Sequence, residues 1–151
     1  MSEAAPDARQ VLAIVAVVLE QGERVDHVSR GLTVASLAGM VAVGMLAARP
    51  PLPAMLLLGA AAFAGLAEIY FAVRVGIDAA LFQRLAAGAD DPDWAVLDAA
   101  LTRLGMLPAA KAGRPAAARI AGAARLLRWQ IAALLVQLGF LTACAFRATM
   151  P

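Results

Sequence analysis

The chain has 151 residues, of which 62% are hydrophobic and 16% are charged, and its mean hydropathy is +0.77. Soluble domains average about 45–50% apolar and about 25% charged residues. A soluble core built from so short a chain has no room for this many apolar side chains, and the same balance excludes intrinsic disorder. The composition therefore predicts an integral membrane protein.

One cysteine, Cys144, and one histidine, His27, limit the chemistry that the chain can supply alone. A single cysteine forms no intramolecular disulfide, and a zinc site needs about four nitrogen or sulfur ligands. The sequence contains no phosphate-binding loop, dinucleotide fingerprint, nucleophile elbow or His-Glu-x-x-His motif. We therefore expect neither an enzyme nor a resident metal or cofactor.

Residues 1–30 are predicted to form a cytoplasmic amphipathic helix that leads toward the first membrane span. From Val11 onward, apolar residues recur at intervals of three and four, and charged residues occupy the other faces. The apolar run from Val11 to Leu19 is nine residues long, which is too short to cross a bilayer. The first ten residues lack the positive region and cleavage site of a signal peptide.

Two segments that follow are long enough to cross the hydrocarbon core, which takes roughly 20 apolar residues at about 1.5 Å each. Residues 31–48 carry no charge, and residues 53–73 carry one, Glu68. The four residues between them include two adjacent prolines, which end the first helix, while Pro53 suits the first turn of the second. The pattern predicts a tight transmembrane helical hairpin. Small residues at four-residue spacing, such as Ala61 with Gly65, favour close packing of its helices.

Residues 74–128 are predicted to form a cytoplasmic helical segment. Gly88 is expected to end the helix that continues from the second span. A new helix is expected after the acidic run, with Asp91 as its N-cap residue and Pro92 in its first turn. The small, turn-rich stretch 107–115 is expected to be a linker.

The short helix that follows Pro92 carries an apolar stripe, with Asp98 and Arg103 expected on its other faces. We expect the stripe to pack on the other cytoplasmic helices, on the membrane surface or on another protein. It consists of Trp94, Leu97, Leu101 and Leu104.

The third predicted span, residues 129–146, is also uncharged and is followed by a short external tail, residues 147–151. Eleven of the thirteen lysines and arginines precede the first span or lie between the second and the third, and two, Arg49 and Arg147, lie on the other side. Positive residues remain in the cytoplasm, so we expect a cytoplasmic N-terminus and an external C-terminus. We interpret the chain as a multi-pass protein of a bacterial inner membrane.

Four arginines lie within fifteen residues that lead into the third span: Arg114, Arg119, Arg125 and Arg128. Arginines in such a position attract anionic lipid headgroups with about 1 kcal/mol each. We expect them to contact anionic lipid. No aromatic and basic recognition surface accompanies them, so we do not expect nucleic acid as a partner.

Glu68 is the one ionisable side chain within a predicted span. A charge left in hydrocarbon costs several kcal/mol, so such a residue is a candidate for proton or substrate transport. A structural alternative is that the carboxyl group pairs with Arg128, pairs with an arginine of another chain, or is protonated. Both interpretations stay open on the sequence alone.

The sequence thus predicts an all-α integral membrane protein with three transmembrane helices, a tight hairpin plus a third span, and a cytoplasmic amphipathic helical module. We expect a non-catalytic accessory, assembly or scaffolding subunit of a membrane complex. Its expected partners are membrane lipids and other membrane subunits or further copies of itself. The alternative is an oligomeric proton-coupled small transporter or channel that uses Glu68; several copies are needed because three helices enclose little of a pathway.

Overall fold

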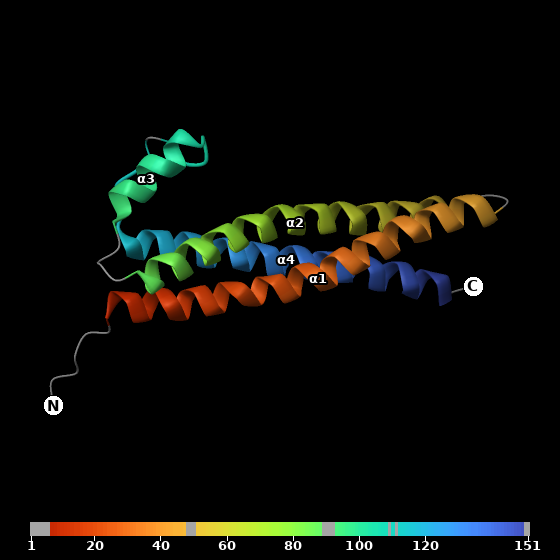
Figure 1. Cartoon of the computed structure of the whole chain (residues 1–151). Helices are drawn as coiled ribbons and strands as arrows, with labels where there is room; N and C mark the ends of the chain where they lie inside the picture. The colour runs from red at the N-terminus through yellow and green to blue at the C-terminus, as the bar shows by residue number, and fades with distance from the viewer. Residues whose placement is uncertain (1–6, 48–50, 89–92, 109, 111, 150–151) are drawn as a thin grey trace, which may run out of the picture.

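The computed structural model describes residues 7–47, 51–88, 93–108, 110 and 112–149. Within these residues the chain is all-helical, with four helices and no strand, as the sequence predicts. The helices are α1 (Ala8–Leu46), α2 (Leu52–Ala87), α3 (Trp94–Arg103) and α4 (Ala116–Thr149). The three long helices lie side by side in an elongated bundle, in which α1 and α4 run in one direction and α2 in the other (Figure 1). The short α3 stands off the end of the bundle at which α1 and α4 begin (Figure 1).

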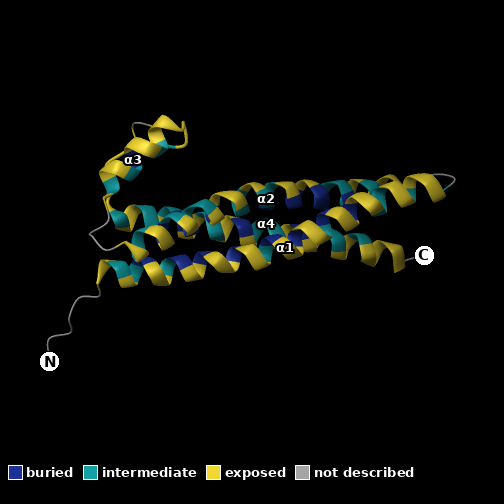
Figure 2. Cartoon of the chain, in the orientation of Figure 1, coloured by how far each residue is buried: buried dark blue, intermediate teal, exposed yellow. Residues whose placement is uncertain are grey.

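The long helices α1, α2 and α4 contain 39, 36 and 34 residues, and each is apolar enough over an 18-residue window to cross a membrane. At about 1.5 Å per residue they are about 50–60 Å long, roughly twice the thickness of the hydrocarbon core. Within the apolar window of each helix, the share of residues buried in the bundle is 17% for α1, 33% for α2 and 6% for α4. Most of the apolar surface therefore faces outward (Figure 2).

Each long helix runs without a break across a boundary that we placed at the membrane surface. The amphipathic segment 1–30 and the span 31–48 share α1, and α2 and α4 likewise continue through residues 73 and 128. No proline interrupts the sequence at these positions, so nothing there stops a helix. The N-terminal helix is consequently an extension of the first span.

Buried positions recur every seven residues on each long helix. A seven-residue period is typical of helices that pack as a left-handed coiled coil. Such series are Leu12, Leu19, Asp26 and Thr33 on α1; Ala61, Glu68, Val75 and Phe82 on α2; and Ala123, Gln130 and Gln137 on α4. The core is apolar near α3, around Leu19, Val75 and Phe82, and becomes polar further along the bundle.

The helices end near the prolines and glycines from which the sequence predicted their ends, but one predicted N-cap residue was wrong. Helix α1 ends at Leu46, α2 begins at Leu52 and the two helices pack on each other, while residues 48–50 between them lie outside the described residues. Gly88 is the C-cap of α2, as predicted. Asp91 was the wrong choice for the N-cap of α3, because that helix begins at Trp94 and Asp93 Oδ1 accepts hydrogen bonds from the backbone N–H groups of the next turn, at 3.0 and 3.1 Å. Asp91 and Pro92 lie outside the described residues.

Candidate functional site

Seven polar side chains of the three long helices are buried among the described residues; Asp26, at 8% exposed, pairs with Arg30, and we call the other six the polar core. They are 0–5% exposed and come from all three helices. The polar core consists of Ser29, Thr33 and Ser36 on α1, Glu68 on α2, and Gln130 and Gln137 on α4. Buried polar groups are costly unless they are hydrogen-bonded, so their partners decide what this region does.

The amide of Gln137 joins α4 to α1. Its Oε1 accepts a hydrogen bond from Ser29 Oγ at 2.8 Å, and its Nε2 donates to Thr33 Oγ1 at 2.9 Å and to the Ser29 carbonyl at 3.3 Å. Gly65 of α2 faces these hydrogen-bonded side chains of α1 and α4. A Cβ added at Gly65 would overlap Thr33 Oγ1 and lie 2.6 Å from Gln137 Nε2. The close packing of the three helices around Gln137 therefore requires glycine at position 65.

The amide of Gln130, one heptad earlier on α4, joins all three helices. Its Nε2 donates to Glu68 Oε1 on α2 and to the Gly22 carbonyl on α1, both at 2.7 Å. Within the described part of the chain, Glu68 Oε2 and Gln130 Oε1 have no hydrogen-bond partner. Both atoms are acceptors while the carboxyl group is ionised, so a proton on Glu68 would add a donor to this pair.

Arg128, one of the alternatives considered for Glu68, lies exposed on α4, and the hydrogen bond that Glu68 accepts comes from Gln130 instead. Arg128 precedes Gln130 by two residues, and two residues correspond to about 200° around a helix. When Gln130 faces the core, Arg128 therefore faces outward. Sequence reasoning had overlooked Gln130 and the rest of the polar core apart from Glu68.

A second cluster, centred on Arg119 at the beginning of α4, holds α3 in place. Arg119 Nη2 lies 2.8 Å from both carboxylate oxygens of Asp98, and the Arg119 Cζ lies 5.0 Å from the centre of the Trp94 ring. Asp98 Oδ2 also accepts a hydrogen bond from the Gly113 N–H at 2.7 Å. This N–H and, secondarily, the Arg119 guanidinium hold the pKa of Asp98 below its ordinary value. Asp98 is buried, although the sequence suggested an outer face for it.

The predicted stripe divides between two environments. Trp94 packs against the apolar core and, with Leu97 and Leu101, lines a cavity beneath α3. Leu104 follows the last residue of α3 and is 71% exposed. The stripe therefore does not form one continuous outer surface.

The four arginines expected to contact lipid also differ. Arg114, Arg125 and Arg128 are exposed, and their contact with lipid stays a prediction. Arg119 is engaged within the chain, with a side chain that is 12% exposed.

Asparagine at position 98 is expected to loosen α3 while the long helices stay packed. The neutral amide loses the charge-assisted bond to Arg119, so backbone amide hydrogen exchange in α3 should become about tenfold faster. The pKa of Asp98 is lowered in the folded chain. The ionised carboxylate therefore holds α3 fully at pH values above the ordinary aspartate pKa of about 3.9. As the pH falls through the lowered pKa, Asp98 is protonated and its contact with Arg119 weakens. Exchange in the Asp98→Asn variant should lack this pH dependence.

Hydrogen exchange followed by mass spectrometry from pH 7 downward measures this effect, after correction for the intrinsic pH dependence of exchange. Arg103→Gln, an exposed substitution on the same helix, is the control. Equal protection of α3 in the Asp98→Asn variant and in the wild type would contradict the assigned role of Asp98.

The single histidine and the single cysteine of the chain stand apart from both clusters. The exposed His27 Nδ1 lies 2.8 Å from the Glu23 carbonyl, and Cys144 is a half-buried free thiol on α4. The described residues include no group of three or more His, Cys, Asp or Glu side chains placed to hold a metal ion. Comparison of the chain with protein families, with curated proteins and with solved structures finds no match.

Proposed function

We propose that this chain is a non-catalytic protein of a bacterial inner membrane and acts as an accessory, assembly or scaffolding subunit of a larger membrane complex. Helices α1, α2 and α4 cross the bilayer in this proposal, with the N-terminus and α3 in the cytoplasm and the C-terminus outside. The outward apolar surface of the long helices supports insertion, and the uneven distribution of arginine supports this orientation.

The position of α3 carries the proposal. This helix projects from the end of the bundle (Figure 1) and is attached by the Arg119 contacts and by Trp94, which packs against the apolar core. Its side chain Val96 is 65% exposed, and Met106, just beyond the helix, is 46% exposed. An exposed helix with apolar side chains, held at a fixed place beside a membrane bundle, is suited to bind another subunit.

The polar core supports the same interpretation. Gln130 and Gln137 direct their amides at groups on neighbouring helices, so these side chains join helices to one another. Hydrogen bonds between helices in lipid average about 0.6 kcal/mol and reach about 1.7 kcal/mol. Such a core stabilises a rigid support for α3.

Photo-crosslinking in intact cells tests this role. A benzoylphenylalanine residue at position 96 should form a discrete adduct with another protein, and the adduct should weaken when Asp98→Asn loosens α3. The same crosslinker at position 63, where Phe63 of α2 is 73% exposed in the apolar region, is the control. If position 96 gives no adduct, or only adducts between copies of the chain, the subunit role is wrong.

An oligomeric proton-coupled transporter or channel is the second candidate, and the unpartnered Glu68 Oε2 favours it. Purified protein in proteoliposomes distinguishes the two proposals. A transporter requires proton-linked substrate flux that Glu68→Gln abolishes while assembly stays intact. A subunit of the kind proposed above gives no such flux.

A further inference from the structure

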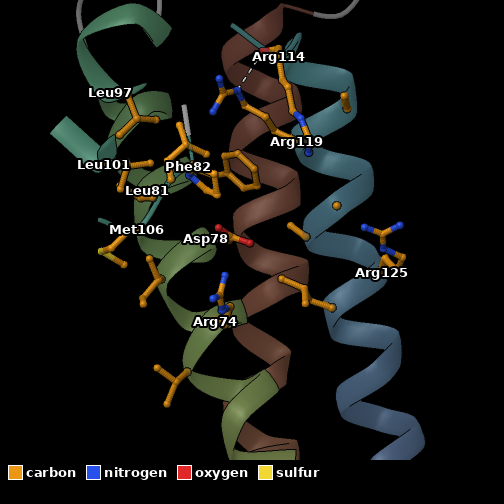
Figure 3. A pocket seen from close by; sticks show the side chains of 18 of the residues that line it. Arg74, Asp78, Leu81, Phe82, Leu97, Leu101, Met106, Arg114, Arg119 and Arg125 are labelled. Carbon is orange, nitrogen blue, oxygen red and sulfur yellow. Dashed lines mark hydrogen bonds between the residues drawn. The ribbon is translucent and has the colours of Figure 1, made fainter. Parts of the chain in front are cut away.

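A cavity of about 660 Å³ lies between α2, α3 and α4, beside the residues that follow α3 (Figure 3). At one end its lining is apolar, with Ile69 and Val73 of α2. Arg74 and Asp78 lie in the middle of the cavity (Figure 3), and the end near α3 combines Arg119 with apolar side chains such as Leu97 and Leu101. A volume in this range is typical of sites for small molecules.

Ile69 and Val73 belong to the predicted second span, and the charged residues of the lining lie outside the predicted spans. Arg74 follows the last residue of that span, and its Cζ lies 5.6 Å from the centre of the Tyr70 ring. Tyrosine and arginine are enriched at this level of membrane proteins, because their apolar parts remain in the acyl region while their polar ends reach the headgroups. In the proposed orientation, the cavity crosses the headgroup level of the inner leaflet.

Arg119 gives the cavity a fixed positive group. Its guanidinium extends from α4 toward α3 (Figure 3) and is held by Asp98, by the Trp94 ring and by the Arg114 carbonyl, which accepts from Nε at 3.0 Å. These contacts use Nε and Nη2, and the described contacts leave Nη1 unused. A guanidinium that is already oriented loses less side-chain entropy when it binds an anion.

The charge around the cavity favours an anion. Four arginines line it, Arg74, Arg114, Arg119 and Arg125, and Asp78 is the one carboxylate among the described residues of its lining. Arg119 is paired with Asp98, so the other three arginines supply the excess positive charge. Burial raises the pKa of the Asp78 carboxyl group, and Arg74 opposes this shift. Arg74 and Asp78 point toward one another in the middle of the cavity (Figure 3).

We propose that this cavity binds one anionic phospholipid of the inner leaflet, with its phosphate beside the lining arginines and part of an acyl chain along Ile69 and Val73. Arginine binds phosphate oxygens through paired N–H groups, which matches a phosphodiester headgroup. The proposal rests on the membrane placement proposed above and is independent of the subunit role. It differs from general attraction of lipid to the arginines before the third span, because Arg128 does not line the cavity.

Gly122 provides a variant that fills the cavity without disturbing the bundle. It lies on α4 in the lining, and an added Cβ meets nothing within 4 Å. Gly122→Leu should therefore occupy part of the cavity that the lipid would fill. Gly139→Leu is the matched control, because Gly139 lies on the same helix with equally open space and does not line the cavity. Arg74→Gln and Arg128→Gln form a second pair, for charge inside and outside the cavity.

Native mass spectrometry of the delipidated full chain in detergent, titrated with dioleoylphosphatidylglycerol, measures the binding. We expect one lipid per chain, with affinity at least about tenfold lower for Gly122→Leu, severalfold lower for Arg74→Gln and unchanged for Gly139→Leu and Arg128→Gln. Circular dichroism confirms that each variant keeps its helices. Dioleoylphosphatidylcholine should bind more weakly, and inorganic phosphate should not compete.

Four outcomes would overturn the proposal. They are equal affinity of Gly122→Leu and wild type, equal binding of the zwitterionic lipid, displacement of the lipid by inorganic phosphate, and a change of oligomeric state caused by Gly122→Leu. The last of these would make the cavity a contact between copies of the chain. The photo-crosslink from position 96 is measured separately, so failure of the lipid site and failure of the subunit role are distinguishable.

Discussion

Leucine in place of Gly65 is expected to force α2 away from α1 and α4 and to lower the free energy of unfolding by about 3 kcal/mol or more. Even a Cβ at this position overlaps Thr33 Oγ1 and lies 2.6 Å from Gln137 Nε2. The helices must separate or the Gln137 hydrogen bonds must break, and each change removes stabilising contacts. Titration of the protein from mild detergent into dodecyl sulfate, followed by far-ultraviolet circular dichroism, measures the loss.

Gly76→Leu is the matched control for this experiment, because Gly76 also lies on α2 and an added Cβ there meets nothing within 4 Å. Its unfolding curve should stay close to that of the wild type. Similar curves for Gly65→Leu and Gly76→Leu would mean that the close approach of the three helices at position 65 does not exist in the folded protein.

Gln130→Leu is expected to lower the free energy of unfolding by about 2–3 kcal/mol. The variant leaves the Glu68 carboxyl group and the Gly22 carbonyl without the hydrogen bonds that Gln130 Nε2 supplies. Buried acceptors that lose their donor keep the full desolvation cost. The same dodecyl sulfate titration applies, with the exposed Gln21→Leu as the control.

A double-mutant cycle separates the pair from its surroundings. Because Glu68→Leu removes the carboxyl group that Gln130→Leu leaves without a donor, the double variant should be more stable than the sum of the two single losses predicts. Strictly additive losses would show that Glu68 and Gln130 do not act as a unit.

Sequence signals that involve only neighbouring residues were enough to predict the long apolar helices, the break between α1 and α2, and the end of α2. Hydropathy depends on a run of neighbouring residues, and a proline or glycine acts on its own turn of helix. The helices continue unchanged through the membrane boundaries proposed at residues 30, 73 and 128, because an α-helix satisfies its own backbone hydrogen bonds equally well in water and in lipid.

The polar core was overlooked because it depends on which helix faces meet. A sequence signal was nevertheless present: Gln130 and Gln137 are polar residues seven positions apart within the third apolar segment, and Ser29 and Ser36 have the same spacing across the start of the first. Combined with Glu68, this period would have suggested a shared interior face. Asp98 gave no such signal, because its burial depends on Gly113 and Arg119, which are distant along the chain.

The two glutamines of α4 also determine how far this helix can slide along its neighbour. Gln130 meets Gly22 and Gln137 meets Ser29, so both contacts share an offset of 108 residues. A slip of one heptad toward the end of α1 would bring Gln130 to Ser29 and remove the amide that Glu68 requires. Since the observed alignment alone places a glutamine amide at Glu68 and a second one at Ser29, the third helix can dock on the other two at a single axial position, even though its alanine-rich surface would tolerate several.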